Sequence, residues 1–234
     1  MRKTLTLLGW AALSVPALAA SPDPVGEALP QGWKQLARVA GDLNRDGRED
    51  LVLVAEQTDP ARFKKNSGLG APVLNLNPRR LLVLLATPSG FKPILSRDGL
   101  LPSANDEDSP CLADPLEDGG GVAIERGNLV IAKQTWMSCG GWGVTQEKFT
   151  LRLEGARFRL IGYDVLEFSR NTGEQSELSV NYLSGKKKIT QGATADGSTQ
   201  PKVTWDRLSP RRAVFLDEMS LNCYAGGRSA NWCR

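Results

Sequence analysis

Short segments in which apolar and polar residues alternate, each ending in a turn, constrain the fold of this 234-residue chain most strongly. The clearest example is 148–163, where the alternation stops at Glu154-Gly155-Ala156 and then resumes. Successive side chains of a strand point to opposite faces, so the apolar residues of this segment would share one buried face. They are Phe149, Leu151, Leu153, Phe158 and Leu160. The segment therefore predicts a β-hairpin.

Three further segment pairs predict hairpins of the same kind: 80–86 with 91–95, 121–125 with 129–133, and 177–183 with 187–191. Helix signals are few, although Ser209-Pro210 could cap a short helix that runs through Leu216. We therefore expect a mainly β fold with little helix, in which antiparallel hairpins form a twisted sheet or sandwich. The length is that of a single domain over 21–234.

Polar residues recur at every second position in the segment 42–50. The side-chain oxygens of Asp42, Asn44 and Asp46 can turn toward one point. Gly47 permits the bend that brings Asp50 to the same point. The predicted ligands are Asp42, Asn44, Asp46, Asp50 and, through its backbone carbonyl, Arg48. Hard oxygen ligands without nitrogen or sulfur are typical of a Ca²⁺ site. The alternative is a solvated turn that holds no metal.

The residues after this loop separate two kinds of calcium site. An EF-hand needs a Glu at the twelfth loop position, which here is Leu53, inside an apolar run that predicts a buried strand. The segment 41–54 instead resembles the calcium-binding loop of FG-GAP/VCBS-type repeats, the blades of integrin-like β-propellers. The resemblance covers about 36–56 and places a strand over 36–40. Propellers carry several such units and this chain has one good copy, so we expect one blade-like unit and not a full propeller.

The first residues predict an exported protein. Met1-Arg2-Lys3 is basic, 5–18 is apolar, and Ala17-Leu18-Ala19 supplies the small residues that a signal peptidase reads. We expect 1–20 to be a signal peptide that is removed. The rest of the sequence has no apolar run of membrane-spanning length, so we expect no membrane insertion after cleavage and a periplasmic or secreted location.

Four cysteines agree with an oxidising compartment. Of the three possible pairings we favour Cys111 with Cys139 and Cys223 with Cys233, since Gly-rich turns accompany both pairs. A metal-binding role for the cysteines is disfavoured because the chain has no Cys-x-x-Cys pair and no histidine.

The absence of histidine also removes the common catalytic arrangements, such as a Ser-His-Asp triad, so we expect that the protein is not an enzyme. Loss of Arg2 and Lys3 with the signal peptide lowers the formal net charge from +3 to +1. A nearly neutral chain gives no reason to expect nucleic-acid binding. The run Lys186-Lys187-Lys188 is interpreted as a solvated hairpin tip.

Two long loops are candidate functional elements. The loop 59–79 could bind a partner. The acidic loop 103–121 could hold a second cation or could simply be solvated, because its acids lack regular spacing. Near it, Trp136 and Trp142 are expected to pack on the Cys111–Cys139 bridge, with contact to a partner as the alternative.

Three classes of function remain open. The first is an exported, calcium-stabilised module whose loops bind a protein or a glycan. The second is a periplasmic inhibitor or immunity-type protein, which is also small, disulfide-bonded and loop-rich. The third is a hydrolase that uses acids of the 103–121 loop, for which Asp106, Asp108 and Asp114 are the candidates. We favour the first class.

Overall fold

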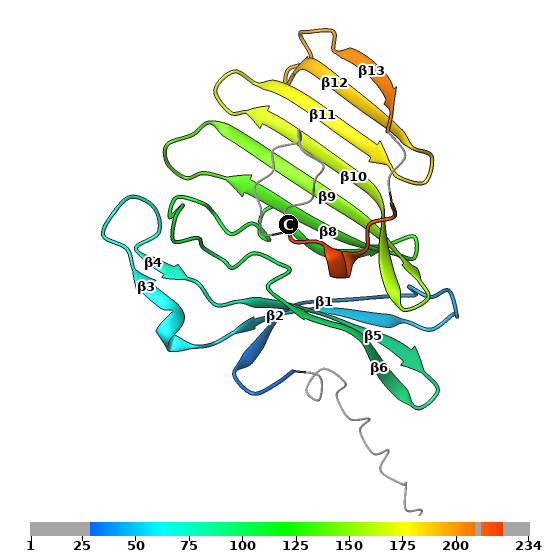
Figure 1. Cartoon of the computed structure of the whole chain (residues 1–234). Coiled ribbons are helices and arrows are strands. Elements are labelled where there is room, and N and C mark those ends of the chain that lie inside the picture. Colours follow the sequence, from blue (N-terminus) through cyan, green and yellow to red (C-terminus); the bar gives the residue numbers. More distant parts are fainter. Residues whose placement is uncertain (1–28, 209–211, 222–234) are drawn as a thin grey trace, which may run out of the picture.

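The computed structural model describes residues 29–208 and 212–221, and almost all of its regular structure is antiparallel β-sheet (Figure 1). A four-stranded sheet has the order β1-β2-β5-β6. Its strands are β1 (Trp33–Gly41), β2 (Asp50–Gln57), β5 (Arg79–Thr87) and β6 (Gly90–Asp98). Each strand pairs with its neighbour in the chain, apart from a small insertion between β2 and β5. The mainly β, antiparallel fold expected from the alternation is confirmed.

A seven-stranded sheet has the order β13-β12-β11-β10-β9-β8-β7, so consecutive strands are again neighbours. Its strands are β7 (Gly121–Glu125), β8 (Asn128–Trp136), β9 (Gly143–Glu154), β10 (Arg157–Ser169), β11 (Glu174–Asn181), β12 (Lys186–Thr194) and β13 (Lys202–Arg207). All four predicted hairpins and the strand over 36–40 are present. Strand β13 was not predicted.

The remaining regular structure is short. A two-stranded ladder, β3 (Phe63–Lys65) with β4 (Val73–Asn75), follows the 3₁₀ turn η1 (Pro60–Arg62) inside the predicted loop 59–79. A second 3₁₀ turn, η2 (Leu216–Glu218), lies near the end of the described chain. The predicted helix from Ser209 to Leu216 is wrong over its described part, since 212–214 are irregular and Phe215 forms a β-bridge with Arg159 on β10.

The main core lies between the inner faces of the two sheets. Val52 and Val54 of the smaller sheet belong to the same buried cluster as Phe149 and Leu160 of the larger one. The predicted face of the 148–163 hairpin is confirmed, with Leu153 packed against this cluster and its other four members fully buried. Residues from loops and from η2 complete the core: Leu43, Leu100, Leu101, Leu216, Met219 and Leu221.

The outer face of the four-stranded sheet carries a second buried cluster: Leu51, Leu53, Ala55, Leu82 and Leu84, with Leu29 and Trp33 packed against it. Strands β2 and β5 are therefore apolar on both faces. This explains why 51–54 is a continuous apolar run and not an alternating one, as expected for a fully buried strand.

The two sheets meet at a corner formed by β1 and β7, and the β11–β13 end of the larger sheet extends beyond the smaller one (Figure 1). Gly41, the last residue of β1, lies at this corner. A Cβ at Gly41 would lie only 2.8 Å from Cγ2 of Ile124 on β7, so a larger residue here would displace the Ile124 side chain. The corner places the 42–50 loop beside the β7–β8 turn.

Candidate functional site

The predicted calcium loop connects β1 to β2 and curls back on itself. Two of its residues, Arg45 and Gly47, have positive φ angles of 63° and 83°. Gly47 therefore supplies the bend expected of it. The β7–β8 turn supports the loop from the side, because a Cβ on Gly127 would lie 3.2 Å from the carbonyl oxygen of Asp42.

Three of the five predicted ligands lie in mutual contact. The N–H of Asp46 donates to Oδ1 of Asp42 at 3.1 Å and to Oδ1 of Asn44 at 3.0 Å. The Asn44 amide donates in turn to Oδ2 of Asp46 at 3.0 Å. Asp42 also accepts from the N–H of Gly47 at 2.8 Å. The side chains of Asp42 and Asn44 thus converge on the backbone N–H of Asp46, and the side chains of Asn44 and Asp46 contact each other.

Asp50 is placed differently from these three. It is fully buried at the start of β2, and its two oxygens accept the N–H groups of Leu43 and Ala86, each at 2.8 Å. Asp50 therefore joins the loop to β5. Because each carboxylate oxygen can accept two hydrogen bonds, Asp50 keeps acceptor capacity that a cation could use.

The side chain of Arg48 shares the loop with its acids. Its guanidinium contacts Oδ2 of Asp46 at 2.5 Å, and its N–H donates to Oδ1 of Asp46 at 2.9 Å. The backbone N–H of Arg48, helped by the Asn44 amide and the Arg48 charge, holds the pKa of Asp46 below its usual value. Asp46 is therefore an anion at neutral pH.

The residue types of the loop fit calcium, since they offer carboxylate, amide and carbonyl oxygens. The gathered side chains of Asp42, Asn44 and Asp46 fit it too, while the Arg48 guanidinium would have to leave Asp46 for an ion to enter. In the part of the chain that the structure describes, no three His, Cys, Asp or Glu side chains form a group that could hold a metal. The oxygen atoms predicted to bind the ion also include two of other kinds, the side-chain oxygen of Asn44 and the backbone carbonyl of Arg48.

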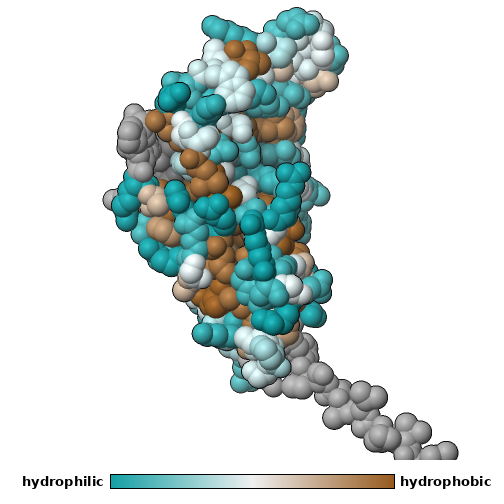
Figure 2. Space-filling model, turned by 90° about the vertical axis from the view of Figure 1, so that its right-hand side faces the viewer, coloured by the Kyte–Doolittle hydropathy of each residue, from teal (hydrophilic) through white to brown (hydrophobic). Residues whose placement is uncertain are grey.

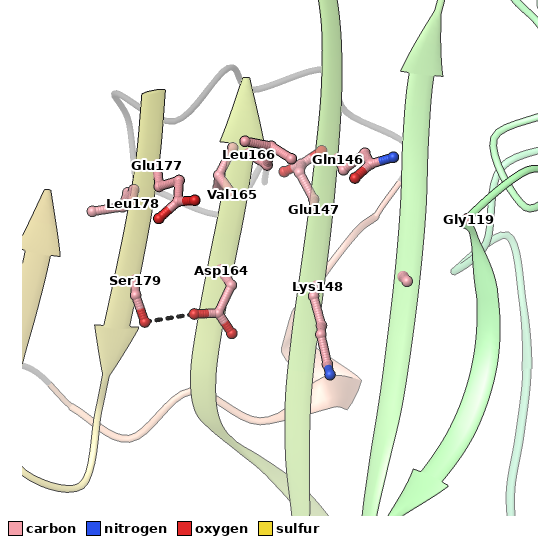
Figure 3. Close-up of a pocket in the computed structure, with 11 residues that line it drawn as sticks. Gly119, Gln146, Glu147, Lys148, Asp164, Val165, Leu166, Glu177, Leu178 and Ser179 are labelled. Carbon is pink, nitrogen blue, oxygen red and sulfur yellow. Dashed lines mark hydrogen bonds between the residues drawn. The ribbon is translucent and has the colours of Figure 1, made fainter. Parts of the chain in front are cut away.

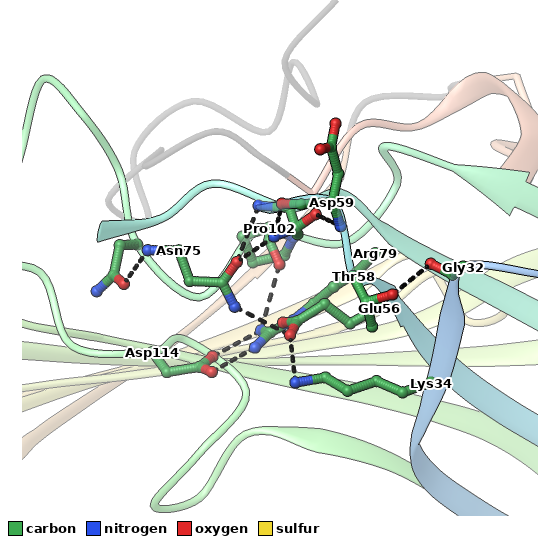
Figure 4. Close-up of polar contacts among 11 residues, drawn as sticks. Gly32, Lys34, Glu56, Thr58, Asp59, Asn75, Arg79, Pro102 and Asp114 are labelled. Carbon is green, nitrogen blue, oxygen red and sulfur yellow. Dashed lines mark hydrogen bonds and ion pairs between the residues drawn. The ribbon is translucent and has the colours of Figure 1, made fainter. Parts of the chain in front are cut away.

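The acidic loop 103–121 is bound to the four-stranded sheet through Arg79 (Figure 4). Arg79 is buried and forms a two-pronged ion pair with Asp114, and its Nε contacts Glu56 at 3.2 Å. Glu56 is also buried and accepts from Lys34 and Asn75, each at 2.9 Å. Asp114 thus has a structural partner that sequence reasoning missed, because Arg79 lies thirty-five residues away.

The other acids of this loop contact groups different from the Arg79 partner of Asp114. Asp106 accepts the backbone N–H groups of Asp108 and Ser109, each at 2.8 Å, and so shapes its own turn. Glu107 forms an ion pair with Lys64 at 2.7 Å. In these contacts Asp106 caps a turn of its own loop and Glu107 joins the loop to β3.

The disulfide Cys111–Cys139 is present, with the two Cα atoms 5.4 Å apart. The other predicted pair, Cys223 with Cys233, lies outside the described residues.

Trp142 is 62% exposed, so its expected burial on the disulfide is wrong, and Trp136 is half-buried. Arg170 lies over both tryptophan rings, with its Cζ 5.0 Å and 5.7 Å from their centroids, and donates to the carbonyls of Met137 and Gly141.

The β3–β4 ladder projects from one end of the molecule (Figure 1). Its apolar side chains Phe63 and Val73 are exposed, and Leu69 at its tip is 76% exposed. The loop 59–79 was expected to be a functional element, but no alternating pattern indicated its internal strands.

A groove on the outer face of the seven-stranded sheet was also not predicted (Figure 3). One row across it contains Gln146, Leu166 and Glu177. The next contains Lys148, Asp164 and Ser179, in which Ser179 donates to Asp164 at 2.5 Å. Lys148 also forms an ion pair with Glu125 at 2.8 Å. Lys148 and Asp164 are thus paired across strands, as on a solvent-facing sheet surface.

No protein-family model matches the chain, and no curated protein and no solved structure matches it significantly. Among the described residues, no helix is long and apolar enough to cross a membrane.

Proposed function

We propose that this protein is an exported, calcium-stabilised interaction module that binds a protein partner through the β3–β4 hairpin. The observation that carries this proposal is a set of exposed apolar side chains on a hairpin that is held in place. Exposed apolar residues that cluster on one projecting element are typical of protein-binding sites. The members of this set are Phe63, Leu69 and Val73.

Several contacts fix the hairpin to the acidic loop. The N–H of Ala71 donates to the carbonyl of Pro110 at 3.3 Å, next to the Cys111–Cys139 disulfide. Gly70 has a φ of 99°, and a Cβ there would lie 2.2 Å from the same carbonyl oxygen. Asn66 closes the tip by donating to the carbonyls of Leu69 and Ala71. A preorganised hairpin loses little conformational entropy on binding, which favours affinity.

In this proposal calcium has a structural task at the corner of the two sheets. The ion would be held by Asp42, Asn44, Asp46, Asp50 and the carbonyl of Arg48, and would offset most of the negative charge of the three acids. It would fix the connection between β1 and β2 and, through Asp50, the contact with β5. Its binding free energy would then be part of the folding free energy.

The projecting hairpin also favours a second candidate, an inhibitor of a periplasmic enzyme. An inhibitor of this kind inserts a rigid loop into an active site, and the tip around Leu69 is exposed and fixed. The two candidates share a surface and differ in the partner. Loss of the partner's enzymatic activity on binding would identify the inhibitor.

The proposal is tested by capture from a periplasmic extract with the mature protein as bait. We expect a partner that the protein retains and that Leu69→Asp loses. The matched control is Leu183→Asp, which places the same charge at another exposed leucine, in the β11–β12 turn. Equal capture by all three baits, or loss with the control alone, would contradict binding through the hairpin.

A further inference from the structure

The two sheets have four edge strands, and three of them carry a feature that hinders pairing with another strand. Strands β1 and β7 approach each other at the corner. Strand β6 contains Pro93, which has no N–H to donate, and a register shift beside it. Strand β13 contains no proline, pairs with β12 without a register shift, and is exposed at every residue. Its outer edge can therefore accept another strand.

The side chains of β13 are arranged antisymmetrically about Thr204. Lys202 lies two residues before it and Asp206 two residues after it, while Val203 and Trp205 flank it. If two copies of β13 pair antiparallel with Thr204 at the centre, Lys202 lies opposite Asp206 of the second copy. Val203 then lies opposite Trp205 of the second copy, on the other face.

We propose that two copies of this chain associate through β13, antiparallel and centred on Thr204, so that their large sheets become one continuous sheet. A two-fold axis through the central pair makes the interface self-complementary, so each ion pair and each apolar pair occurs twice.

The exposure of these side chains supports a second copy as the partner. Trp205 is 68% exposed and Val203 46%, and pairing would cover them with each other. The end of the molecule where β12 and β13 lie is otherwise mainly hydrophilic, with a small hydrophobic spot (Figure 2). Lys202 has no ion-pair partner among the described residues, so its charge is free to meet an acid.

A lysine of the same chain keeps Asp206 charged for that contact. Lys187 lies 3.0 Å from Oδ2 of Asp206 on the neighbouring strand. The hydrogen bond from Lys187 lowers the pKa of Asp206, which keeps this carboxylate charged. Because the carboxylate is still largely exposed, it can accept a second cation from Lys202 of another copy.

The interface is small, since one six-residue strand meets its copy. We therefore expect a weak, reversible dimer, with a Kd on the order of 10⁻⁵ to 10⁻⁴ M. Higher salt should weaken the dimer, because its ion pairs are exposed to solvent.

Sedimentation of the mature protein over concentrations that bracket this Kd tests the proposal. We expect a monomer–dimer equilibrium, and Lys202→Asp or Asp206→Lys alone should raise the Kd about 10-fold or more, because two attractive pairs become repulsive. An equimolar mixture of the two variants should restore association, since each then offers the charge that the other lacks.

The matched control is Lys92→Asp, which makes the same charge change on the edge strand β6 and should leave the Kd unchanged. Melting curves followed by circular dichroism establish that each variant is folded. A protein that stays monomeric throughout the series overturns the proposal. So does a dimer that both reversals leave intact, or variants that fail to associate when mixed. Binding of a foreign peptide at β13 without self-association would identify a different occupant and also overturns it.

Discussion

At the scale of single residues, the core contains a buried ion pair that the alternation of apolar residues does not predict. Lys133 of β8 and Glu147 of β9 are both buried, with Nζ and Oε2 2.9 Å apart, and the hydroxyl of Tyr163 donates to the other Glu147 oxygen at 2.6 Å. Burial, together with the Glu147 carboxylate, raises the pKa of Tyr163, so its hydroxyl stays protonated and continues to donate. The three side chains therefore satisfy one another inside the core.

We expect Lys133→Met to lower the free energy of unfolding by about 3–5 kcal/mol, because Glu147 would be left buried and unpaired. The double variant Lys133→Met/Glu147→Leu removes both charges and should be more stable than Lys133→Met alone. Urea unfolding at neutral pH measures all three proteins. If the double variant is the least stable of the three proteins, the expectation is wrong, and the Lys133–Glu147 pair stabilises the fold by more than cancelling two buried charges.

At the scale of elements, Gly70 holds the β3–β4 hairpin against the acidic loop. Its φ is 99°, and a Cβ would meet backbone atoms of Pro110 that cannot move aside. We expect Gly70→Ala to lift the hairpin tip and to expose it to limited proteolysis. Gly68→Ala is the matched control, since its Cβ would lie 3.3 Å from one side-chain oxygen of Asn66. Equal cleavage of both variants would show that the hairpin is not held by this contact.

Elements with strong alternation could be predicted from the sequence, and weaker ones could not. The 148–163 hairpin buries its apolar residues in the core, so apolar and polar residues alternate clearly along its sequence. Strand β13 also alternates, but both of its faces are exposed, so little burial distinguishes it from a loop. The short helix was predicted from Ser209-Pro210, whereas Phe215 pairs with Arg159 on β10, a contact distant in sequence. Tertiary pairing overrode the local signal.

At the scale of the whole molecule, local spacing indicated which polar residues of the 42–50 loop contact one another, but not what surrounds the loop. The contact among Asp42, Asn44 and Asp46 follows from alternation within five residues. The bond from Ala86 to Asp50 depends on the register of β2 with β5, which no local pattern contains. The same holds for Arg79 and Asp114, which join a sheet to a loop. Polar contacts between residues distant in sequence could therefore not be predicted from local patterns.

We propose that calcium stabilises this fold through the 42–50 loop, and melting curves in millimolar calcium and in chelator are the decisive measurement. At a hundred times its Kd, an ion adds about 2.7 kcal/mol to the free energy of unfolding. The protein should therefore melt at a higher temperature in calcium, and Asp46→Ala should abolish the difference. Asp196→Ala, in an exposed Asp-Gly turn without neighbouring acids, should retain it. Identical melting in calcium and chelator, or an equal calcium shift in Asp46→Ala, would show that calcium does not stabilise the fold through this loop.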